Sequence, residues 1–227
     1  MKSARIEIIL LIVVLFVAVA ANEAPLAYDQ KGGKGGTWYP PVYPRSVGKV
    51  DGWVLESGEF TNVGGTLNSV STVFNVGDNA QKKQYRSILH FNTAPYSIPH
   101  TAIIYKAVIR IKLEGIIGTN PFTSFGTMYV DMRKPSFGTV ILAIGDFQMT
   151  AGRYQAAYFT NAGGGWYKAT LSATARAYIN KAGSTQFRLY FKLDDDNDTI
   201  ADYMKFYSGD VTTASLRPSL ELNYYVP

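Results

Sequence analysis

The stretch TQFRLYFKLDDDNDTIADYMKFYSGDVTTASLRPSLELNY, residues 185–224, decides the fold because two alternating segments flank an acidic loop. Apolar side chains occupy every second position from Phe187 to Leu193, and polar or amphipathic side chains fill the positions between them. Leu220, Leu222 and Tyr224 repeat this alternation near the end of the stretch. A period of two is typical of antiparallel strands with one buried face, so we expect a strand at each end.

Further alternating segments follow one another at short spacing along the rest of the chain. Besides the strand at residues 187–193, we predict strands at residues 53–55, 67–76, 86–91, 107–113, 128–133, 166–171, 203–207 and 219–225. The one helix that we expect is short, at residues 173–181, and Gly183 closes it. Many short strands separated by turn residues indicate an all-β sandwich or barrel.

The N-terminus has the layout of a secretory signal peptide, which we assign to residues 1–21. Lys2 and Arg5 precede an uninterrupted apolar run at residues 8–21, which ends on small residues. As a helix this run reaches roughly 21 Å, short of the roughly 30 Å hydrocarbon core of a bilayer, so we expect no retained membrane span. A retained anchor or pilin-type leader is the alternative, for which Glu7 is a hint. We expect cleavage near Ala20 or Ala21 and export to the cell surface or the extracellular space.

Composition narrows the classes of partner. The chain contains no cysteine, so a disulfide or a lipid-modified cysteine is excluded, and stability outside the cell must come from the core or a bound ion. The formal net charge is +5, and the basic residues are scattered singly along the expected strands. No run of Lys or Arg forms an electrostatic footprint for nucleic acid, and we expect no nucleic-acid partner.

A segment rich in glycine, proline and aromatic residues separates the leader from the domain. Residues 22–47 contain a Gly-Gly-Lys-Gly-Gly run followed by three prolines, which predicts a flexible and then extended linker. The remaining chain, residues 48–227, is long enough for one β-sandwich domain. Trp38, Tyr39 and Tyr43 in the linker either dock back on the domain, which we favour, or form an exposed contact strand for assembly.

Three blocks of the chain resemble the DNRLRE-type domain: DGWVLESGEFTNVGGTLN at residues 51–68, YRSILHFNTAPYSIPHTAIIYKAVIRIKL at residues 85–113, and the closing stretch with FYSGD and RPSLELNY. The resemblance covers residues 49–225. It implies a secreted two-sheet antiparallel jelly-roll sandwich, similar to carbohydrate-binding modules, that serves as an accessory or surface domain without catalytic residues. Here no enzyme accompanies the module, only a leader and a linker.

The acidic loop is the candidate metal site. Asp194, Asp196 and Asp198 stand at alternate positions, and carboxylates so placed converge when a loop curls around a hard cation such as calcium. Thr199 and Lys205 break the EF-hand pattern at its sixth and twelfth positions. We therefore predict a structural calcium site of another type, drawn from Asp194, Asp196, Asp198 and Asp202, which jelly-roll modules of the resembling group often carry. The alternative is a solvated acidic hairpin loop.

Aromatic side chains are the candidate ligand platforms, because sugar rings stack on flat aromatic faces while hydroxyl groups need polar partners. Trp166, Tyr167, Trp53 and Tyr43 are the candidates, with Trp166 first because it follows three glycines at the start of a strand. The alternative is that the tryptophans fill the core. His90 and His100 lie in no catalytic motif, so we expect no enzyme activity.

Two functions fit these features. The first is an exported, non-catalytic module for adhesion or polysaccharide binding, with a polysaccharide or cell-surface component as its partner. The second is a structural subunit of an extracellular filament or surface layer, in which residues 22–47 add to the open sheet edge of a neighbouring copy. The second makes the protein a homo-oligomer, and the first leaves it a monomer.

Overall fold

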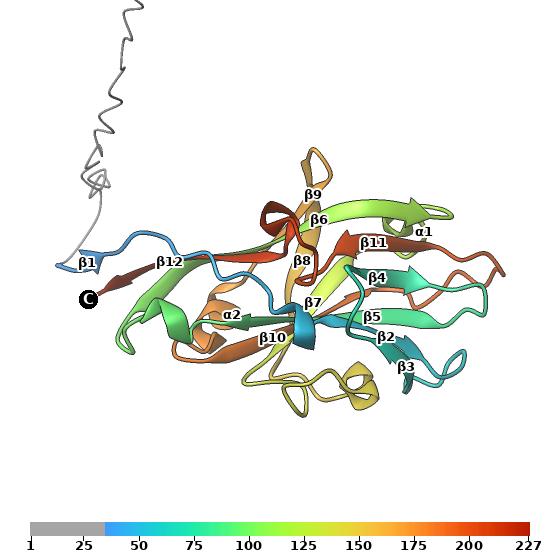
Figure 1. Cartoon of the computed structure of the whole chain (residues 1–227), viewed down its shortest axis with the longest axis horizontal. Coiled ribbons are helices and arrows are strands. Elements are labelled where there is room, and N and C mark those ends of the chain that lie inside the picture. Colours follow the sequence, from blue (N-terminus) through green and yellow to red (C-terminus); the bar gives the residue numbers. More distant parts are fainter. Residues whose placement is uncertain (1–34) are drawn as a thin grey trace, which may run out of the picture. The chain divides into compact units, whose positions relative to one another are not determined.

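The computed structural model describes residues 35–227. The predicted signal peptide, residues 1–21, and the first part of the predicted linker lie outside the described residues. Every strand pairing is antiparallel, which confirms the expected all-β fold. Eight strands close into a barrel, because the β6–β9 pairing joins the two ends of the row. In order around the barrel (Figure 1) they are β6 (Ile103–Ile117), β11 (Tyr203–Tyr207), β4 (Val73–Asp78), β5 (Gln84–Asn92), β10 (Ser184–Phe191), β7 (Met128–Arg133), β8 (Arg153–Gly163) and β9 (Trp166–Thr170).

Extra strands extend the barrel at two places. Beside β6 lies β12 (Ser219–Val226), which in turn pairs with β1 (Thr37–Trp38). Beside β5 lies β2 (Gly52–Glu56), which pairs with β3 (Gly64–Asn68). The helical elements are short: α1 (Pro121–Ser124), α2 (Ala173–Tyr178), η1 (Gly48–Val50), η2 (Ala94–Tyr96), η3 (Ile144–Phe147) and η4 (Ala214–Leu216).

Helices contribute little to this part of the chain. Asn120 caps α1 and Ser172 caps α2, each by accepting a backbone N–H bond of the first turn with its side-chain oxygen. The second helix confirms the expected one, although it ends at Tyr178, three residues earlier than predicted. Among the residues that the structure describes, no helix is long and apolar enough to cross a bilayer.

The barrel interior is a packed core. Alternate residues of β10 and β12 point inward, as their period of two predicted, and Phe187, Leu189, Leu220 and Leu222 are fully buried. Phenylalanine supplies much of the filling: Phe74, Phe91, Phe125, Phe159, Phe187, Phe191 and Phe206. Each such side chain contributes about 1.5–3 kcal/mol to stability by leaving water.

A long loop, residues 134–152, covers the outer face of β5 and β10. Phe137, Leu142 and Phe147 from this loop form a second small core with Val54 and Ile88. This is why the side of β10 that the sequence predicted to be polar and exposed is in fact buried.

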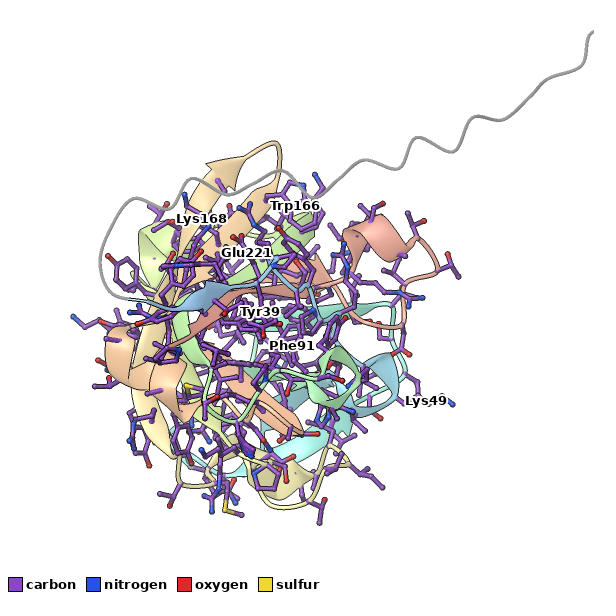
Figure 2. All side chains as sticks on the ribbon, turned by 90° about the vertical axis from the view of Figure 1, so that its left-hand side faces the viewer. Tyr39, Lys49, Phe91, Trp166, Lys168 and Glu221 are labelled. Atoms are coloured by element: carbon purple, nitrogen blue, oxygen red, sulfur yellow. The ribbon has the colours of Figure 1, made fainter. Side chains whose placement is uncertain are left out.

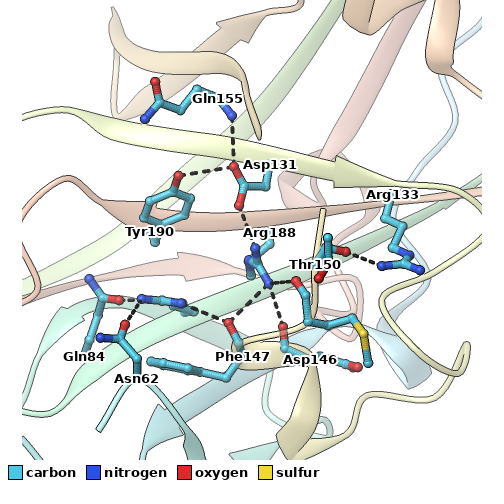
Figure 3. Close-up of polar contacts among 12 residues, drawn as sticks. Asn62, Gln84, Asp131, Arg133, Asp146, Phe147, Thr150, Gln155, Arg188 and Tyr190 are labelled. Carbon is cyan, nitrogen blue, oxygen red and sulfur yellow. Dashed lines mark hydrogen bonds and ion pairs between the residues drawn. The ribbon is translucent and has the colours of Figure 1, made fainter. Parts of the chain in front are cut away.

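Arg188 on β10 fixes the loop (Figure 3). Its Nη1 donates to the carbonyl oxygens of Asp146, Phe147 and Met149 at 2.7–3.2 Å. Its Nη2 lies 2.7 Å from Asp131 Oδ2 on β7 in a buried ion pair. A charge removed from water is tolerated only when paired and hydrogen-bonded, and here both conditions hold.

Three strand predictions need correction. The strand expected at residues 67–76 is two strands, because residues 69–72 turn between β3 and β4. Strand β8 was missed, because its sequence RYQAAYFTNAG lacks clear alternation and Gln155 takes a positive φ of 48°. The strand at 187–193 ends at Phe191, and Leu193 is 48% exposed at the start of the acidic loop.

The second half of the predicted linker is part of the domain. β1 pairs with the end of β12, and isolated bridges join Val42 to Leu222 and Arg45 to Ser219. Residues 35–227 belong to one compact unit. The extended backbone that the prolines predicted is therefore present, but it lies against the edge of β12 rather than free between domains.

Candidate metal site and aromatic pocket

The acidic cluster lies where three chain segments meet at one end of the barrel. Strands β4 and β6 both end there beside the start of β11, where Tyr203 pairs with Gly77 on one side and with Ile117 on the other. The β10–β11 connection, residues 192–202, projects from the same end (Figure 1). Gly118, at φ +67°, allows the chain after β6 to pass Asp202, because a Cβ at Gly118 would lie 2.0 Å from Asp202 Oδ1.

Three of the four predicted metal ligands come together. Asp196, Asp198 and Asp202 each present a carboxylate oxygen within 4.8 Å of the others. Asp202 is buried, Asp198 half-buried and Asp196 exposed. Asp194 is not in this group, although the sequence pattern included it. Local hydrogen bonds shape the loop, since Asp198 Oδ1 accepts the N–H bond of Ile200 at 2.6 Å.

Asp78, at the end of β4, joins the cluster from a distant part of the chain. Its Oδ1 accepts the N–H bond of Asp202 at 3.0 Å, and its own N–H donates to the carbonyl of Asp202 at 3.0 Å. Burial first, and then the nearby charges of Asp196, Asp202 and Asp195, raise the pKa of Asp78 to about 7. Sequence reasoning missed Asp78, because only the barrel brings β4 beside the acidic loop.

Two buried carboxylate oxygens in this cluster have no hydrogen-bond partner. Asp78 is 0% and Asp202 is 1% exposed, and the Oδ2 atom of each lacks a donor within the described residues. Asp202 Oδ1, by contrast, accepts the N–H bond of Thr119 at 2.6 Å. Buried polar atoms in proteins are normally paired, so such oxygens beside further carboxylates fit an arrangement that can hold a metal ion.

An open pocket lies beside β12, β6 and β9, where the N-terminal segment and η4 also reach it. It has a volume of about 260 Å³, and two aromatic, two basic and two hydroxyl side chains line it: Tyr43, Arg45, Arg110, Trp166, Ser215 and Ser219. Figure 2 shows Trp166 on the same side of the molecule as Lys168 of β9 and Glu221 of β12. Tyr43 is 52% exposed, so part of its ring surface remains accessible to a ligand.

The predicted ligand aromatics separate into three environments. Trp166 lines the pocket, as a ligand platform requires. Tyr167 does not reach the surface: it is 5% exposed and stacks on Phe122 at 5.3 Å, so its proposed ligand role is corrected to a core role. Trp53 is half-buried and meets Tyr85 edge to face at 5.1 Å, packed against the main core. Neighbouring residues in a strand face opposite ways, which explains why Trp166 and Tyr167 cannot both be exposed.

The aromatic residues predicted for assembly are docked within the chain itself. Trp38 stacks on Tyr225 at 4.8 Å, and Tyr39 stacks on Tyr224 at 5.3 Å. Tyr43 forms one wall of the pocket. The favoured docking of this segment is therefore observed, and it brings Tyr43 and Arg45 to the pocket.

Neither histidine lies in a catalytic arrangement. His90 is buried, burial lowers the pKa of its imidazole, and its Nδ1 lies 3.5 Å from Gln186 Nε2.

No family model and no curated protein matches the chain. The residues that sequence reasoning missed at the pocket are Arg45, Ser215 and Ser219, because Arg45 lies far from the two serines in the chain. Arg110 carried one signal, because it alternates with Ile109 and Ile111 and therefore faces outward.

Proposed function

We propose that the chain is an exported, non-catalytic module that binds polysaccharide at the pocket formed by Tyr43 and Trp166. The single observation that carries this proposal is the composition of the pocket. Two aromatic rings there stand beside two guanidinium groups and two hydroxyl groups. Sugars bind through stacking of their C–H faces on rings and through hydrogen bonds of their hydroxyl groups, and the pocket offers both.

We also propose that the barrel is a jelly roll flattened into two layers. One layer would contain β8, β9, β6, β12 and β1, and the other β11, β4, β5, β10 and β7. The shifts in register between β6 and β11 and between β7 and β8 lie at the two places where these layers join. Bulges of this kind let strands turn a corner between sheets. Two such layers are what the resemblance to DNRLRE-type modules implies.

The acidic cluster has a supporting role in the proposal. We assign it to a structural calcium ion held by Asp196, Asp198 and Asp202, with Asp78 adding negative charge from β4. Calcium accepts six to eight oxygen ligands in flexible geometry, which suits a loop contributing side chains from several positions. The ion would tie the loop of residues 192–202 to the ends of β4 and β6, and would leave the distant pocket free.

Affinity electrophoresis of the mature chain tests the binding function. Gels would contain an α-glucan, a β-1,4-xylan, polygalacturonate or a sulfated galactan. We expect at least one polysaccharide to retard the protein, and Trp166→Ala to weaken this binding roughly two- to tenfold through the loss of ring stacking. Tyr154→Ala is the matched control, because Tyr154 is 60% exposed on β8 and does not line the pocket. Absence of retardation by every polysaccharide, or equal weakening by both variants at equal thermal stability, would contradict the proposal.

A structural subunit of a filament or surface layer is the second candidate. The observation that favours it is that β1 and residues 39–46 already behave as an added strand, with backbone hydrogen bonds to β12. The same contacts made with the β12 edge of a neighbouring copy would link subunits. We rank this candidate lower, since the segment fills the edge of its own barrel.

A further inference from the structure

We infer that the pocket at Trp166 accepts an acidic sugar unit, so that the polysaccharide ligand carries carboxylate or sulfate groups. This inference rests on the proposed function and narrows its ligand class. The pocket belongs to a larger outer face on which basic side chains gather. Five cations lie on this face, contributed by the N-terminal segment, β6 and β9: Arg45, Lys106, Arg110, Lys112 and Lys168.

A cross-strand row carries three of these cations. Arg110 of β6 pairs with Ser219 of β12 on one side and with Lys168 of β9 on the other. Ser219 in turn bridges to Arg45 in the N-terminal segment. Directly paired residues of antiparallel strands project from the same face about 4.5–5.5 Å apart at Cβ. The row therefore presents Arg45, Arg110 and Lys168 to the same side, and Arg45 and Arg110 both line the pocket.

The cross-strand pairing of Arg110 with Lys168 destabilises the sheet locally. Like charges directly opposite in neighbouring strands destabilise a sheet, whereas an opposite charge at either position would stabilise it. Lys112, two residues along β6, adds a third cation beside this pair. Its partner is Trp166, and its Nζ lies 5.8 Å from the centre of the Trp166 ring. A locally unfavourable cluster around an aromatic platform is the pattern expected where binding matters more than stability.

Glu221 pairs with two of these cations, and Glu114, which is also on β6, is engaged by Lys205 at 2.7 Å. Glu221 lies 2.6 Å from Lys106 Nζ and 3.8 Å from Arg110 Nη2. In residues 35–227, no carboxylate lies within ion-pair distance of Arg45, Lys112 or Lys168. An anion arriving at the pocket would therefore meet uncompensated positive charge. The acidic loop of residues 192–202 holds three further carboxylates that are not buried, Asp194, Asp196 and Asp198.

The geometry points to a sugar acid rather than to nucleic acid. Guanidinium groups bind carboxylate and sulfate oxygens in a bidentate manner, and the hydroxyl groups of Ser215 and Ser219 suit the hydroxyl groups of a sugar. A volume of 260 Å³ is slightly below the roughly 300–1,000 Å³ of pockets for drug-sized ligands, which suits one monosaccharide unit. The five cations of this face are fewer than the phosphates, about 6–10, in a protein–DNA contact with strong salt dependence.

Isothermal titration with matched oligosaccharides tests this inference. The ligands are oligogalacturonate, its methyl ester, which has the same rings without the charge, and a sulfated galactan oligosaccharide. We expect the acid to bind at least about tenfold more tightly than the ester and to weaken as salt is added. Arg110→Gln/Lys168→Gln should weaken binding of the acid about tenfold or more and leave binding of the ester unchanged. The sulfated arm distinguishes carboxylate from sulfate as the preferred anion.

Two control variants protect the interpretation. Lys192→Gln removes an exposed cation of β10's end that does not line the pocket, and it should leave binding unchanged. Asp198→Asn, at constant calcium, should also retain binding, which excludes a calcium bridge between the uronate and the acidic loop. Equal binding of acid and ester would overturn the inference and leave the proposed function standing. Tighter binding of single-stranded DNA than of any sugar would also overturn it, and no binding of any glycan would overturn both proposals.

Discussion

At the level of single residues, the carboxylates at the end of the barrel conflict with one another most. Asp78 and Asp202 are buried, are joined by two hydrogen bonds, and each have one oxygen without a donor. Two negative charges so close in a medium of low dielectric cannot both remain without a proton or a cation. The raised pKa of Asp78 and the proposed calcium ion are two answers to the same electrostatic problem.

Asp78 should give the protein a pH-dependent stability that calcium removes. Its pKa is about 7 in the native state, above the ordinary value of 3.8, because of burial and then of neighbouring charges. The native state therefore binds this proton more tightly than the unfolded state does. Without divalent cations, the free energy of unfolding should be highest below about pH 4 from this group and should fall as the pH rises to 7. Saturating calcium should flatten this slope by stabilising the carboxylate, as thermal unfolding at a series of pH values would measure.

Asp78→Asn is the variant that separates this group from the others. Asp51 also has a pKa raised to about 7, mainly by burial, so it contributes to the slope with the same sign. The asparagine keeps an oxygen that can accept the Asp202 N–H bond and removes the charge. We expect the variant to lose part of the slope and to gain less thermal stability from calcium. An identical slope in the variant would show that Asp78 does not cause the pH dependence, and no effect of calcium on the wild-type protein would rule out the metal assignment.

At the level of elements, the loop of residues 134–152 depends on one side chain. Arg188 joins β10 to β7 through Asp131 and holds three carbonyl oxygens of the loop. The sequence pattern predicted Arg188 to be on the exposed face of its strand, and it is 4% exposed. Strand periodicity assigns a residue to a face, but it does not say whether a distant loop covers that face.

Arg188→Met should release the loop and destabilise the protein. The substitution keeps an apolar stem but leaves the buried carboxylate of Asp131 without its ion-pair partner, which costs about 3–5 kcal/mol in comparable cases. Hydrogen exchange should show faster exchange of backbone amides in residues 134–152. Arg133→Gln is the control, because Arg133 donates to Thr150 of the same loop from a more exposed position. A loss of stability below 1 kcal/mol, or exchange spread evenly over the barrel, would show that Arg188 does not hold the loop.

The elements that sequence predicted well are those whose inner and outer faces differ clearly. Three predicted strands lie within β5, β6 and β11: residues 86–91, 107–113 and 203–207. They could be predicted because apolar alternation directly reflects one buried face. β8 escaped notice since both of its exposed tyrosines, Tyr154 and Tyr158, are as apolar in sequence as a core residue. A strand face of buried apolar residues and a strand face of exposed aromatic residues have the same hydrophobicity in the sequence. Only the packing of the folded chain shows which face is buried.

At the level of the whole molecule, the two candidate sites show that residues close together in the sequence can be predicted as a site, whereas residues from distant segments cannot. The acidic cluster was predictable because Asp196, Asp198 and Asp202 lie within seven residues, whereas Asp78 was not. The pocket combines the N-terminal segment, β6, β9 and β12, so only its two aromatic residues, Tyr43 and Trp166, were predicted as ligand platforms. Closure of the barrel was equally hidden, because the β6–β9 pairing joins strands that are separated by α1, β7 and β8.

The two candidate functions predict opposite effects of deleting residues 22–46 on the oligomeric state. In the structure, β1 and the bridge at Val42 occupy the edge of β12. We expect the mature chain, residues 22–227, to be a monomer at all concentrations in size exclusion with light scattering. Deletion of residues 22–46 should expose the edge of β12 and give concentration-dependent association, because an open strand edge pairs with other chains. Deletion of residues 22–34 alone, which keeps the docked segment, should leave a monomer. Oligomers of the intact chain that disappear on the longer deletion would reverse our ranking, since the segment would then be joining subunits.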